Sequence, residues 1–307
     1  MSIDIVITWV DGNDPKWLEK KEKFSPNKKS IKTSNVKGRF RDNEELKYLL
    51  RSIEKNYFIS NPNIFLVVDD QTPEWLNQNH VTIVNYKDFI PQRYLPLFSS
   101  RAIESFFHKI PGISDYFIYL NDDCFFSKKI NKEDLFIEQK PIMHFELNKI
   151  NIENDISTEN FANINAGILA SKLVLKDYNT KFENLTAHSP RFVDRDFIFK
   201  IENTYPEIFE KTRTGRFREY DSHSIISSLY PHLYIAENRG VVKFDDIFYM
   251  GNNDVNAKEK YKHLLENDYY GVCINDTSDN LSSEHIIFKE QKDFYLKKFP
   301  KKSKYEK

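Results

Sequence analysis

Glycine is scarce in this 307-residue chain, which contains only 8 glycines. Neither a GxGxxG nor a GxxxxGK[ST] pattern occurs. These patterns mark the loops that cradle phosphates in dinucleotide-binding folds and in P-loop enzymes. Their absence argues against a glycine-rich phosphate loop.

Cysteine, an excess of one charge and long apolar runs are also lacking. The two cysteines, Cys124 and Cys273, lie far apart without a CxxC pattern, which argues against a disulfide framework or a cysteine zinc site and fits a reducing cytosol. The net charge is −1, so nucleic acid is not an expected partner. No apolar run approaches membrane-spanning length, and the first residues lack signal-peptide features. We therefore expect a cytoplasmic protein.

Aromatic residues are abundant instead, with 25 Phe and 17 Tyr, and Tyr116–Leu120 predicts a short buried strand. The strand stops on Asn121-Asp122-Asp123, and adjacent carboxylates are costly to bury without partners. They fit the mouth of an open α/β sheet, where ligands bind beyond the strand ends and a metal, or phosphate with arginine, compensates them. A solvated turn is the alternative, because Asn-Asp-Asp also favours turns.

Other apolar segments repeat this pattern. The strand predicted for residues 3–10 ends on Asp11-Gly12, and the one predicted for residues 64–68 ends on Asp69-Asp70. Strands alternating with helical periodicity predict an α/β fold with a mostly parallel sheet flanked by helices. We expect one domain over residues 1–307. Residues 1–140 would form its α/β part, and residues 141–307 a smaller helical part whose last strand and helix complete the site.

Cationic residues gather in two places. Arg39 precedes a helix expected to begin near Asp42, and free backbone N–H groups at a helix start suit an anion. Residues 211–218 hold four cations in eight positions, and arginine makes bidentate contacts to phosphate. A basic surface loop explains that cluster equally well.

Two further side chains are candidates for proton transfer or positioning. His188 is expected just before a long helix running towards Thr204, where backbone dipoles would keep its imidazole neutral and able to act as a base. A structural histidine is the alternative. Glu104 and His108 stand four apart on another expected helix, so they should share a face.

Together these residues indicate a metal-assisted reaction on a phosphate or nucleotide-sugar substrate. Acids would bind the metal, arginines would neutralise phosphate charge, and a histidine would accept a proton. The residues alone do not say which bond breaks.

Four blocks of sequence carry a resemblance to a known family. They are residues 3–15; residues 39–54 with 73–76, 102–105 and 119–123; residues 187–190 with 209–218; and residues 273–276. In this order and combination they resemble the Stealth family of sugar-1-phosphate transferases. That family includes bacterial capsule and exopolysaccharide phosphotransferases and the eukaryotic N-acetylglucosamine-1-phosphotransferase.

The resemblance implies a modified glycosyltransferase-A-like α/β fold in which residues 1–140 bind a nucleotide sugar. It implies transfer of hexose-1-phosphate or N-acetylhexosamine-1-phosphate from a UDP-sugar to a glycan hydroxyl. UMP would leave, and a phosphodiester would form in capsular or other cell-surface polysaccharide. Magnesium (Mg2+) is the implied cofactor, with manganese as its alternative.

The resemblance also implies roles for individual residues. His188 would be the base for the acceptor hydroxyl, and Arg218 would hold the transferring phosphate. Glu104 would bind sugar hydroxyls or position His188. Asp123 would belong to the catalytic set, and Asp123 and Asp276 would bind the metal or orient the base. The implied substrate-binding residues are Trp9, Val10, Asp11, Gly12, Arg39, Asn43 and Asp122.

The expected partners are a UDP-sugar donor and an oligosaccharide or lipid-linked glycan acceptor. The basic segment of residues 297–304 is either a frayed, solvated end or a peripheral contact with the cytoplasmic face of the inner membrane.

Two alternatives are an ordinary glycosyltransferase that releases UDP and a non-catalytic glycan-binding module. His188 and the cluster Arg213–Arg218 favour phosphoryl transfer over the glycosyltransferase, because sugar transfer needs no arginine on a phosphate that becomes electrophilic.

Overall fold

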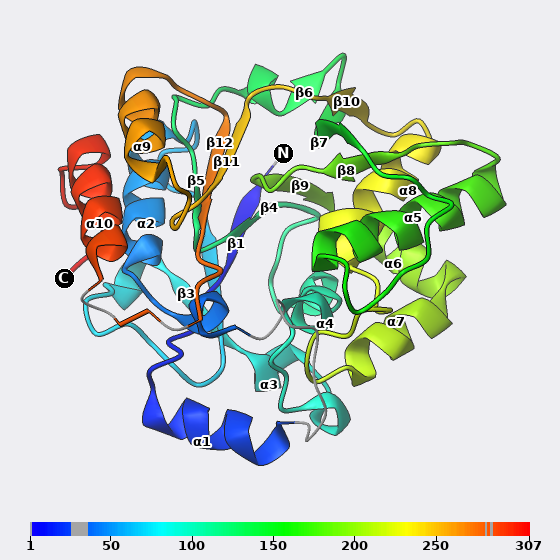
Figure 1. Ribbon diagram of the computed structural model, residues 1–307, viewed down its shortest axis with the longest axis horizontal. Helices are drawn as coiled ribbons and strands as arrows, with labels where there is room; N and C mark the ends of the chain where they lie inside the picture. The colour runs from blue at the N-terminus through cyan, green and yellow to red at the C-terminus, as the bar shows by residue number, and fades with distance from the viewer. Residues whose placement is uncertain (1, 26–35, 280, 283–284) are drawn as a thin grey trace.

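The computed structural model describes residues 2–25, 36–279, 281–282 and 285–307 (Figure 1). At its centre lies a five-stranded sheet in the order β3-β2-β1-β4-β9. Four strands run parallel, and β9 is antiparallel to β4. The expected α/β fold with a mostly parallel sheet is confirmed. The strands are β1 (Asp4–Thr8), β2 (Ile64–Val68), β3 (Thr82–Asn85), β4 (Tyr116–Asn121) and β9 (Arg191–Asp194).

The middle strands of this sheet form the core of the protein. Residues 5–7 of β1 are completely buried, and every residue of β2 is buried. Continuous apolar strands of this kind are typical of parallel sheets covered on both faces. The register pairs Thr8 with Val67 of β2 and with Asn121 of β4. The three strands therefore end level, and the residues that follow them meet at one edge.

Helices flank the sheet on two sides (Figure 1). The expected amphipathic helix is α2, whose Leu46, Leu49, Leu50 and Ile53 are at most 1% exposed. The helices on one side of the view are α2 (Glu45–Asn56), α9 (Ala257–Glu266) and α10 (Ile286–Lys298). Those on the other are α5 (Ala162–Tyr178), α6 (Arg195–Thr204), α7 (Pro206–Thr214) and α8 (Tyr230–Ala236). Shorter or separate helices are α1 (Pro15–Phe24), α3 (Tyr86–Phe89) and α4 (Ser100–Glu104).

The part of the chain after residue 140 contributes strands as well as helices. β7 (Lys140–Lys149) pairs with β10 (Val241–Lys243), β6 (Phe136–Ile137) and β8 (Asn184–Thr186). In a third sheet β12 (Gly271–Asn275) lies between β11 (Ile247–Gly251) and β5 (Cys124–Phe125). Strand β9 joins the central sheet itself. The part of the chain after residue 140 therefore contributes strands to all three sheets.

The basic segment at residues 297–304 packs onto the protein. Phe299, Ser303 and the neighbouring Tyr305 are buried. The guanidinium of Arg51 on α2 holds the carboxylate of Glu306 through two bonds of 2.9 and 2.7 Å. The expectation of a frayed, solvated end is therefore wrong. None of the helices that the structure describes combines the length and apolar character needed to cross a bilayer.

Candidate active site

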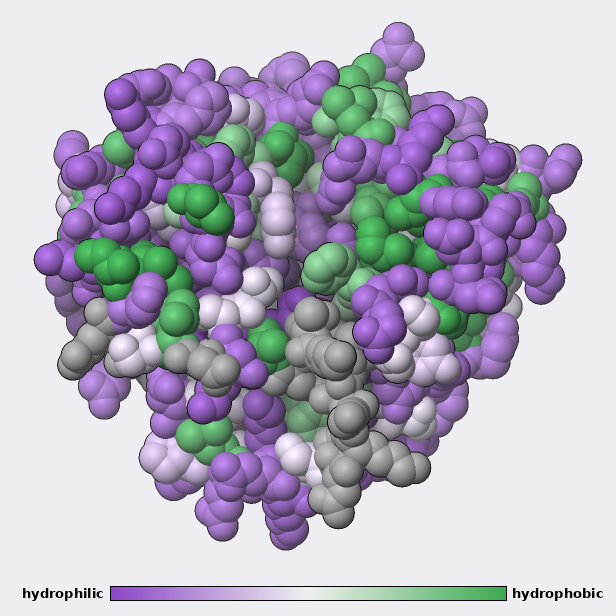
Figure 2. All heavy atoms as spheres, in the orientation of Figure 1, coloured by the Kyte–Doolittle hydropathy of each residue, from purple (hydrophilic) through white to green (hydrophobic). Residues whose placement is uncertain are grey.

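A cavity of about 660 Å³ opens at the edge of the central sheet where β1 and β4 end. Its wall is built by residues that follow these two strands, by α4, by the segment before β9 and by residues after β12. Figure 2 shows the molecule hollowed near the middle of one face, with hydrophobic side chains gathered beside the hollow towards α5 and β8. The cavity is large enough for a nucleotide sugar.

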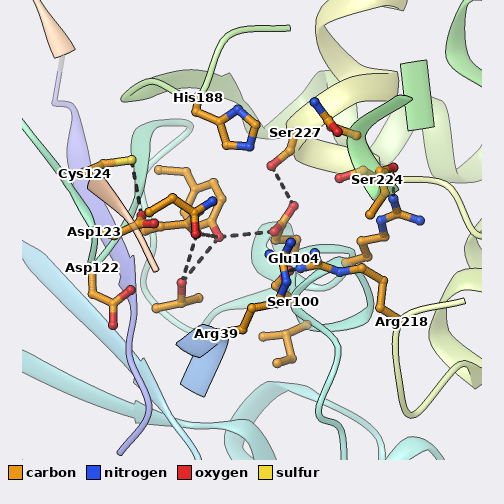
Figure 3. A pocket seen from close by; sticks show the side chains of 18 of the residues that line it. Arg39, Ser100, Glu104, Asp122, Asp123, Cys124, His188, Arg218, Ser224 and Ser227 are labelled. Atoms are coloured by element: carbon orange, nitrogen blue, oxygen red, sulfur yellow. Dashed lines mark hydrogen bonds between the residues drawn. The ribbon is translucent and has the colours of Figure 1, made fainter. Parts of the chain in front are cut away.

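The structure brings most of the sequence-predicted residues to this cavity. His188 and Glu104 point towards the same space, and Arg39 and Arg218 extend towards it (Figure 3). Strand ends, a short helix and a loop from distant parts of the sequence therefore converge. The predicted residues on the cavity wall are Trp9, Val10, Arg39, Glu104, Asp122, Asp123, His188, Arg218 and Asp276.

Asp11, Gly12 and Asn43 are not among the residues that line the cavity. Gly12 instead supports the segment that carries Arg39. Its backbone N–H donates to the carbonyl of Phe40 over 2.6 Å, and an added Cβ would lie 2.3 Å from that oxygen. Asn43 donates to Glu45 over 2.9 Å, and Asp11 accepts from the following turn. Gly12 and Asn43 therefore contact lining residues, Phe40 and Glu45, without lining the cavity themselves.

His188 has a neutral imidazole, but for a different reason than expected. It precedes strand β9 rather than a helix, and α6 begins only at Arg195. The expected helix start at His188 is therefore wrong. Burial, and then the nearby cations Arg191, Arg39 and Arg218, lower the pKa of His188 to about 4. The imidazole is therefore unprotonated at neutral pH and can accept a proton.

Glu104 faces the cavity from the end of α4. Its carboxylate accepts hydrogen bonds from Ser227 over 3.0 Å and from Tyr119 over 3.2 Å. Burial raises its pKa, against the opposing effects of Ser227 and two arginines. His108 lies in a separate 3-10 turn and bonds to Glu202 instead, at 2.5 Å. The expectation that Glu104 and His108 share a helix face is therefore wrong.

Arginines line the cavity from several elements. Arg101 and Arg191 join Arg39 and Arg218, although neither was singled out from the sequence. Arg101 stands three residues before Glu104 on one helical turn, a spacing that places both on one face. Burial and the neighbouring cations Arg39 and Arg101 lower the pKa of Arg218. Because the arginines repel one another, an anion in the cavity would be stabilised.

Of the basic cluster at residues 211–218, Arg218 is the member that reaches the cavity. Its Nη2 donates to Ser100 over 2.7 Å, while its buried Nε has no hydrogen-bond partner within the described part of the chain. Arg213 is buried elsewhere, where it pairs with Glu202 and bonds Ser105. The cluster as a whole is therefore not a phosphate site.

Carboxylates form the opposite wall. Burial and nearby acids, Asp123 first, raise the pKa of Asp122 well above its usual range. Asp123 accepts hydrogen bonds from the thiols of Cys124 over 3.5 Å and Cys273 over 3.6 Å. Asp276 forms an ion pair with Arg41 and accepts two bonds from Ser278. The carboxylates of Asp123 and Asp276 thus each have partners within the protein.

Three family models match this chain. They describe conserved regions 1, 2 and 3 of Stealth proteins, and they match residues 1–29, 39–144 and 187–236. A capsular polysaccharide phosphotransferase of Haemophilus influenzae is 31% identical over 301 residues, which cover 94% of this chain and 81% of that protein. The chain belongs to the Stealth family. The resemblance carried by the sequence blocks is thereby confirmed, and the matched regions contain His188, Arg218, Glu104 and Asp123.

Other Stealth relatives are longer. The capsular polysaccharide phosphotransferase SacB of Neisseria meningitidis serogroup A is 35% identical over 294 residues, covering 92% of this chain and 53% of SacB. This Stealth chain therefore spans about half the length of SacB.

Among solved structures, the Stealth chain is similar to two glycosyltransferases. The galactosyltransferase LgtC, in complex with donor and acceptor sugar analogues, has a TM-score of 0.45 and 8% identity, with 98% of this chain and 97% of LgtC covered. A glycosyltransferase of Streptococcus pneumoniae has a TM-score of 0.45 and 12% identity, with 96% and 60% covered. Family membership rests on the sequence matches.

Proposed function

We propose that this chain transfers a sugar-1-phosphate from a UDP-sugar to a hydroxyl of a glycan, releasing UMP. The observation that carries the proposal is a neutral histidine facing the same cavity as four arginines. Membership of a family with capsular phosphotransferases supports it. The product would be a phosphodiester of a capsular or related surface polysaccharide.

His188 is proposed to take the proton of the acceptor hydroxyl. The hydroxyl oxygen would bond to the sugar-bearing phosphorus, the phosphoanhydride bond to UMP would break, and the proton would pass to the imidazole. Burial, and after it three cations, depress the pKa of His188 in the free protein. A bound diphosphate would offset those cations, so the imidazole would become a stronger base when the donor is present.

Arg218 is proposed to hold the transferring phosphate, with Arg39, Arg101 and Arg191 adding positive charge around it. An arginine placed where negative charge develops stabilises the transition state of phosphoryl transfer. Arg218 suits this task because its buried Nε has no hydrogen-bond partner among the residues that the structure describes, while Ser100 fixes one end of the guanidinium. Glu104 has no hydrogen bond to His188 within the described residues, so we assign it to a sugar hydroxyl of the substrate.

Magnesium remains a proposal, and the residues expected to bind it do not form a ready set of oxygen ligands. Mg2+ prefers oxygen ligands in octahedral geometry and often uses one or two carboxylates with substrate phosphates. Asp276 is already engaged by Arg41 and Ser278, and Asp123 faces two thiols. No step is therefore assigned to the metal.

The test is the nucleotide released. Purified protein is incubated with magnesium, a panel of UDP-sugars and capsule-type oligosaccharides, and the products are read by anion-exchange chromatography and phosphorus NMR. We expect acceptor-dependent UMP and a new phosphodiester signal. His188→Gln should abolish both, whereas His263→Gln, a change of an exposed histidine outside the cavity, should leave them unchanged. Release of UDP without a phosphodiester would overturn the proposal in favour of attack at the sugar carbon.

A further inference from the structure

The two cysteines of the chain meet across a pair of strands on the cavity wall. Cys124 of β5 stands directly opposite Cys273 of β12 in an antiparallel register. The adjacent pair, Asp123 and Ile274, carries a backbone hydrogen bond of 3.0 Å. Cys124 and Cys273 therefore occupy a position without hydrogen bonds between them, where Cα atoms are about 4.5 Å apart and side chains lie closest. The separation of the two cysteines in the sequence predicted no shared metal site, but the pairing of β5 with β12 brings their side chains together.

A carboxylate lies beside both thiols. Each oxygen of Asp123 accepts a bond from one thiol, at 3.5 and 3.6 Å (Figure 3 shows the bond to Cys124). The ligand atoms of the three side chains all lie within 4.8 Å of one another. Buried cysteines usually pack as small apolar groups. Apolar packing does not account for a half-buried carboxylate that contacts two buried thiols, because even partial desolvation of a carboxylate is costly.

We propose that Asp123, Cys124 and Cys273 form a binding site for a thiophilic divalent cation such as Zn2+, with its fourth position open to the cavity. Zinc is bound tetrahedrally by thiolates and carboxylates, and three protein ligands with one open position is a common arrangement. Zn–S bonds of about 2.3 Å and Zn–O bonds of about 2.1 Å place sulfur and oxygen about 3.6 Å apart in a tetrahedron. Each carboxylate oxygen of Asp123 lies at about that distance from one of the two sulfurs, Oδ1 from Cys124 and Oδ2 from Cys273, so a rotation of the carboxylate brings one oxygen towards both. Magnesium, a hard cation, has little affinity for the two sulfurs.

Charge balance also fits a bound cation. Binding displaces one proton from each thiol to solvent, so one carboxylate and two thiolates surround the ion and the site carries one net negative charge. The guanidinium of Arg39 lies within electrostatic range of Asp123 and Cys273 and compensates that charge. Asp123 and Cys124 line the cavity, so an ion can enter from it.

Direct binding tests the site. Protein without a histidine tag is stripped with a chelator, kept reduced and titrated with Zn2+ in competition with a chromophoric chelator. Co2+ serves as a spectroscopic probe. We expect one Zn2+ per chain and a thiolate-to-cobalt charge-transfer band. Absence of the band and of stoichiometric zinc would overturn the proposal.

Variants identify the ligands. Cys124→Ala and Cys273→Ala should each weaken zinc binding at least about tenfold and remove the cobalt band. His263→Gln is the matched control, because an exposed imidazole is the usual source of adventitious zinc. If zinc binding is lost in that control and kept in the cysteine variants, the proposed site is wrong. If the cysteine variants do not fold, Asp123→Asn tests the site instead. This variant keeps the shape of the side chain and both thiols, and it should still weaken zinc binding.

A consequence for turnover rests on the proposed function. Zinc at this site would occupy Asp123 and reduce sugar-phosphate transfer measured with magnesium. The ratio of rates with and without zinc should fall in the wild-type protein and stay near one in Cys124→Ala. Zinc binding without any transferase activity would reject the proposed function and keep the site. Sugar-phosphate transfer without zinc binding would reject the zinc site and keep the proposed function.

Discussion

The ring of Tyr249 packs against the imidazole of His188, with centroids 4.9 Å apart and planes tilted by 44°. Tyr249 belongs to β11, and its hydroxyl accepts a hydrogen bond of 3.2 Å from Asn275 at the end of β12. Two strands outside the central sheet therefore fix one side of the proposed base. We infer that Tyr249 positions the imidazole of His188, a role that the sequence did not reveal.

Removing that ring should impair catalysis without weakening donor binding. Tyr249→Ala is expected to lower kcat by about tenfold to a hundredfold, because a small displacement of a catalytic group carries a cost of this size. KM for the donor should change little. Tyr249→Phe keeps the packing against His188 and should restore most of kcat. Equal losses in both variants would show that the hydroxyl, and not the ring, matters.

The pH dependence of turnover should reveal what depresses the pKa of His188. That pKa is about 4 in the free protein, so kcat/KM should stay flat from pH 8 down to about 5 and fall only below that. If donor phosphates offset the arginines, the acid limb of kcat lies at higher pH than that of kcat/KM. Steady-state measurements of kcat and kcat/KM across this pH range compare the two acid limbs. Coincident limbs would mean that the bound donor leaves the cations uncompensated.

Arg218 and Arg213 should behave differently although they lie five positions apart. Arg218→Lys keeps a charge but loses the planar fork, so kcat/KM should fall about a hundredfold with the melting temperature nearly unchanged. Arg213→Leu removes buried bonds to Glu202 and Ser105, and should lower the free energy of unfolding by about 2 kcal/mol. Its activity per folded molecule should be retained. Both variants are compared by kcat/KM and by urea unfolding. A loss of activity in Arg213→Leu with activity retained in Arg218→Lys would place the phosphate at Arg213.

The sequence predicted the central sheet well because buried parallel strands have a simple signature. Continuous apolar runs identified β1, β2 and β4, and acids after them located the edge where the cavity opens. The amphipathic period of α2 was equally clear. Apolar runs and amphipathic periods can be read from residues that are close together in the sequence, so these strands and this helix were predictable.

What the sequence could not predict depends on contacts between distant segments. The segment after His188 resembled a helix start, yet residues 191–194 pair with β4, because an apolar edge strand completes the sheet. Arg213 and Arg218 are chemically alike, and tertiary packing alone sends one to Glu202 and the other to the cavity. The meeting of Cys124 and Cys273 likewise follows from the pairing of β5 and β12.

Buried histidines should make the fold sensitive to mild acid. His144 is stacked on Tyr270 with both ring nitrogens unpartnered among the described residues, and burial lowers its pKa to about 3. His232 is 1% exposed, and burial lowers its pKa to about 4. An unfolded histidine has a pKa of about 6.5. Between pH 6.5 and 4 the unfolded chain therefore binds protons that the folded chain does not, and stability falls as pH falls.

The size of the effect can be measured by urea unfolding at pH 7 and pH 5. Each of these histidines should remove about 2 kcal/mol of unfolding free energy over that interval. His144→Phe preserves the ring stack on Tyr270 and removes the titrating group, so its loss between the two pH values should be smaller than that of the wild type by about this amount. His263→Gln is the exposed control and should follow the wild type. If His144→Phe follows the wild type as well, the folded protein already admits a proton at His144, and burial does not hold that imidazole neutral.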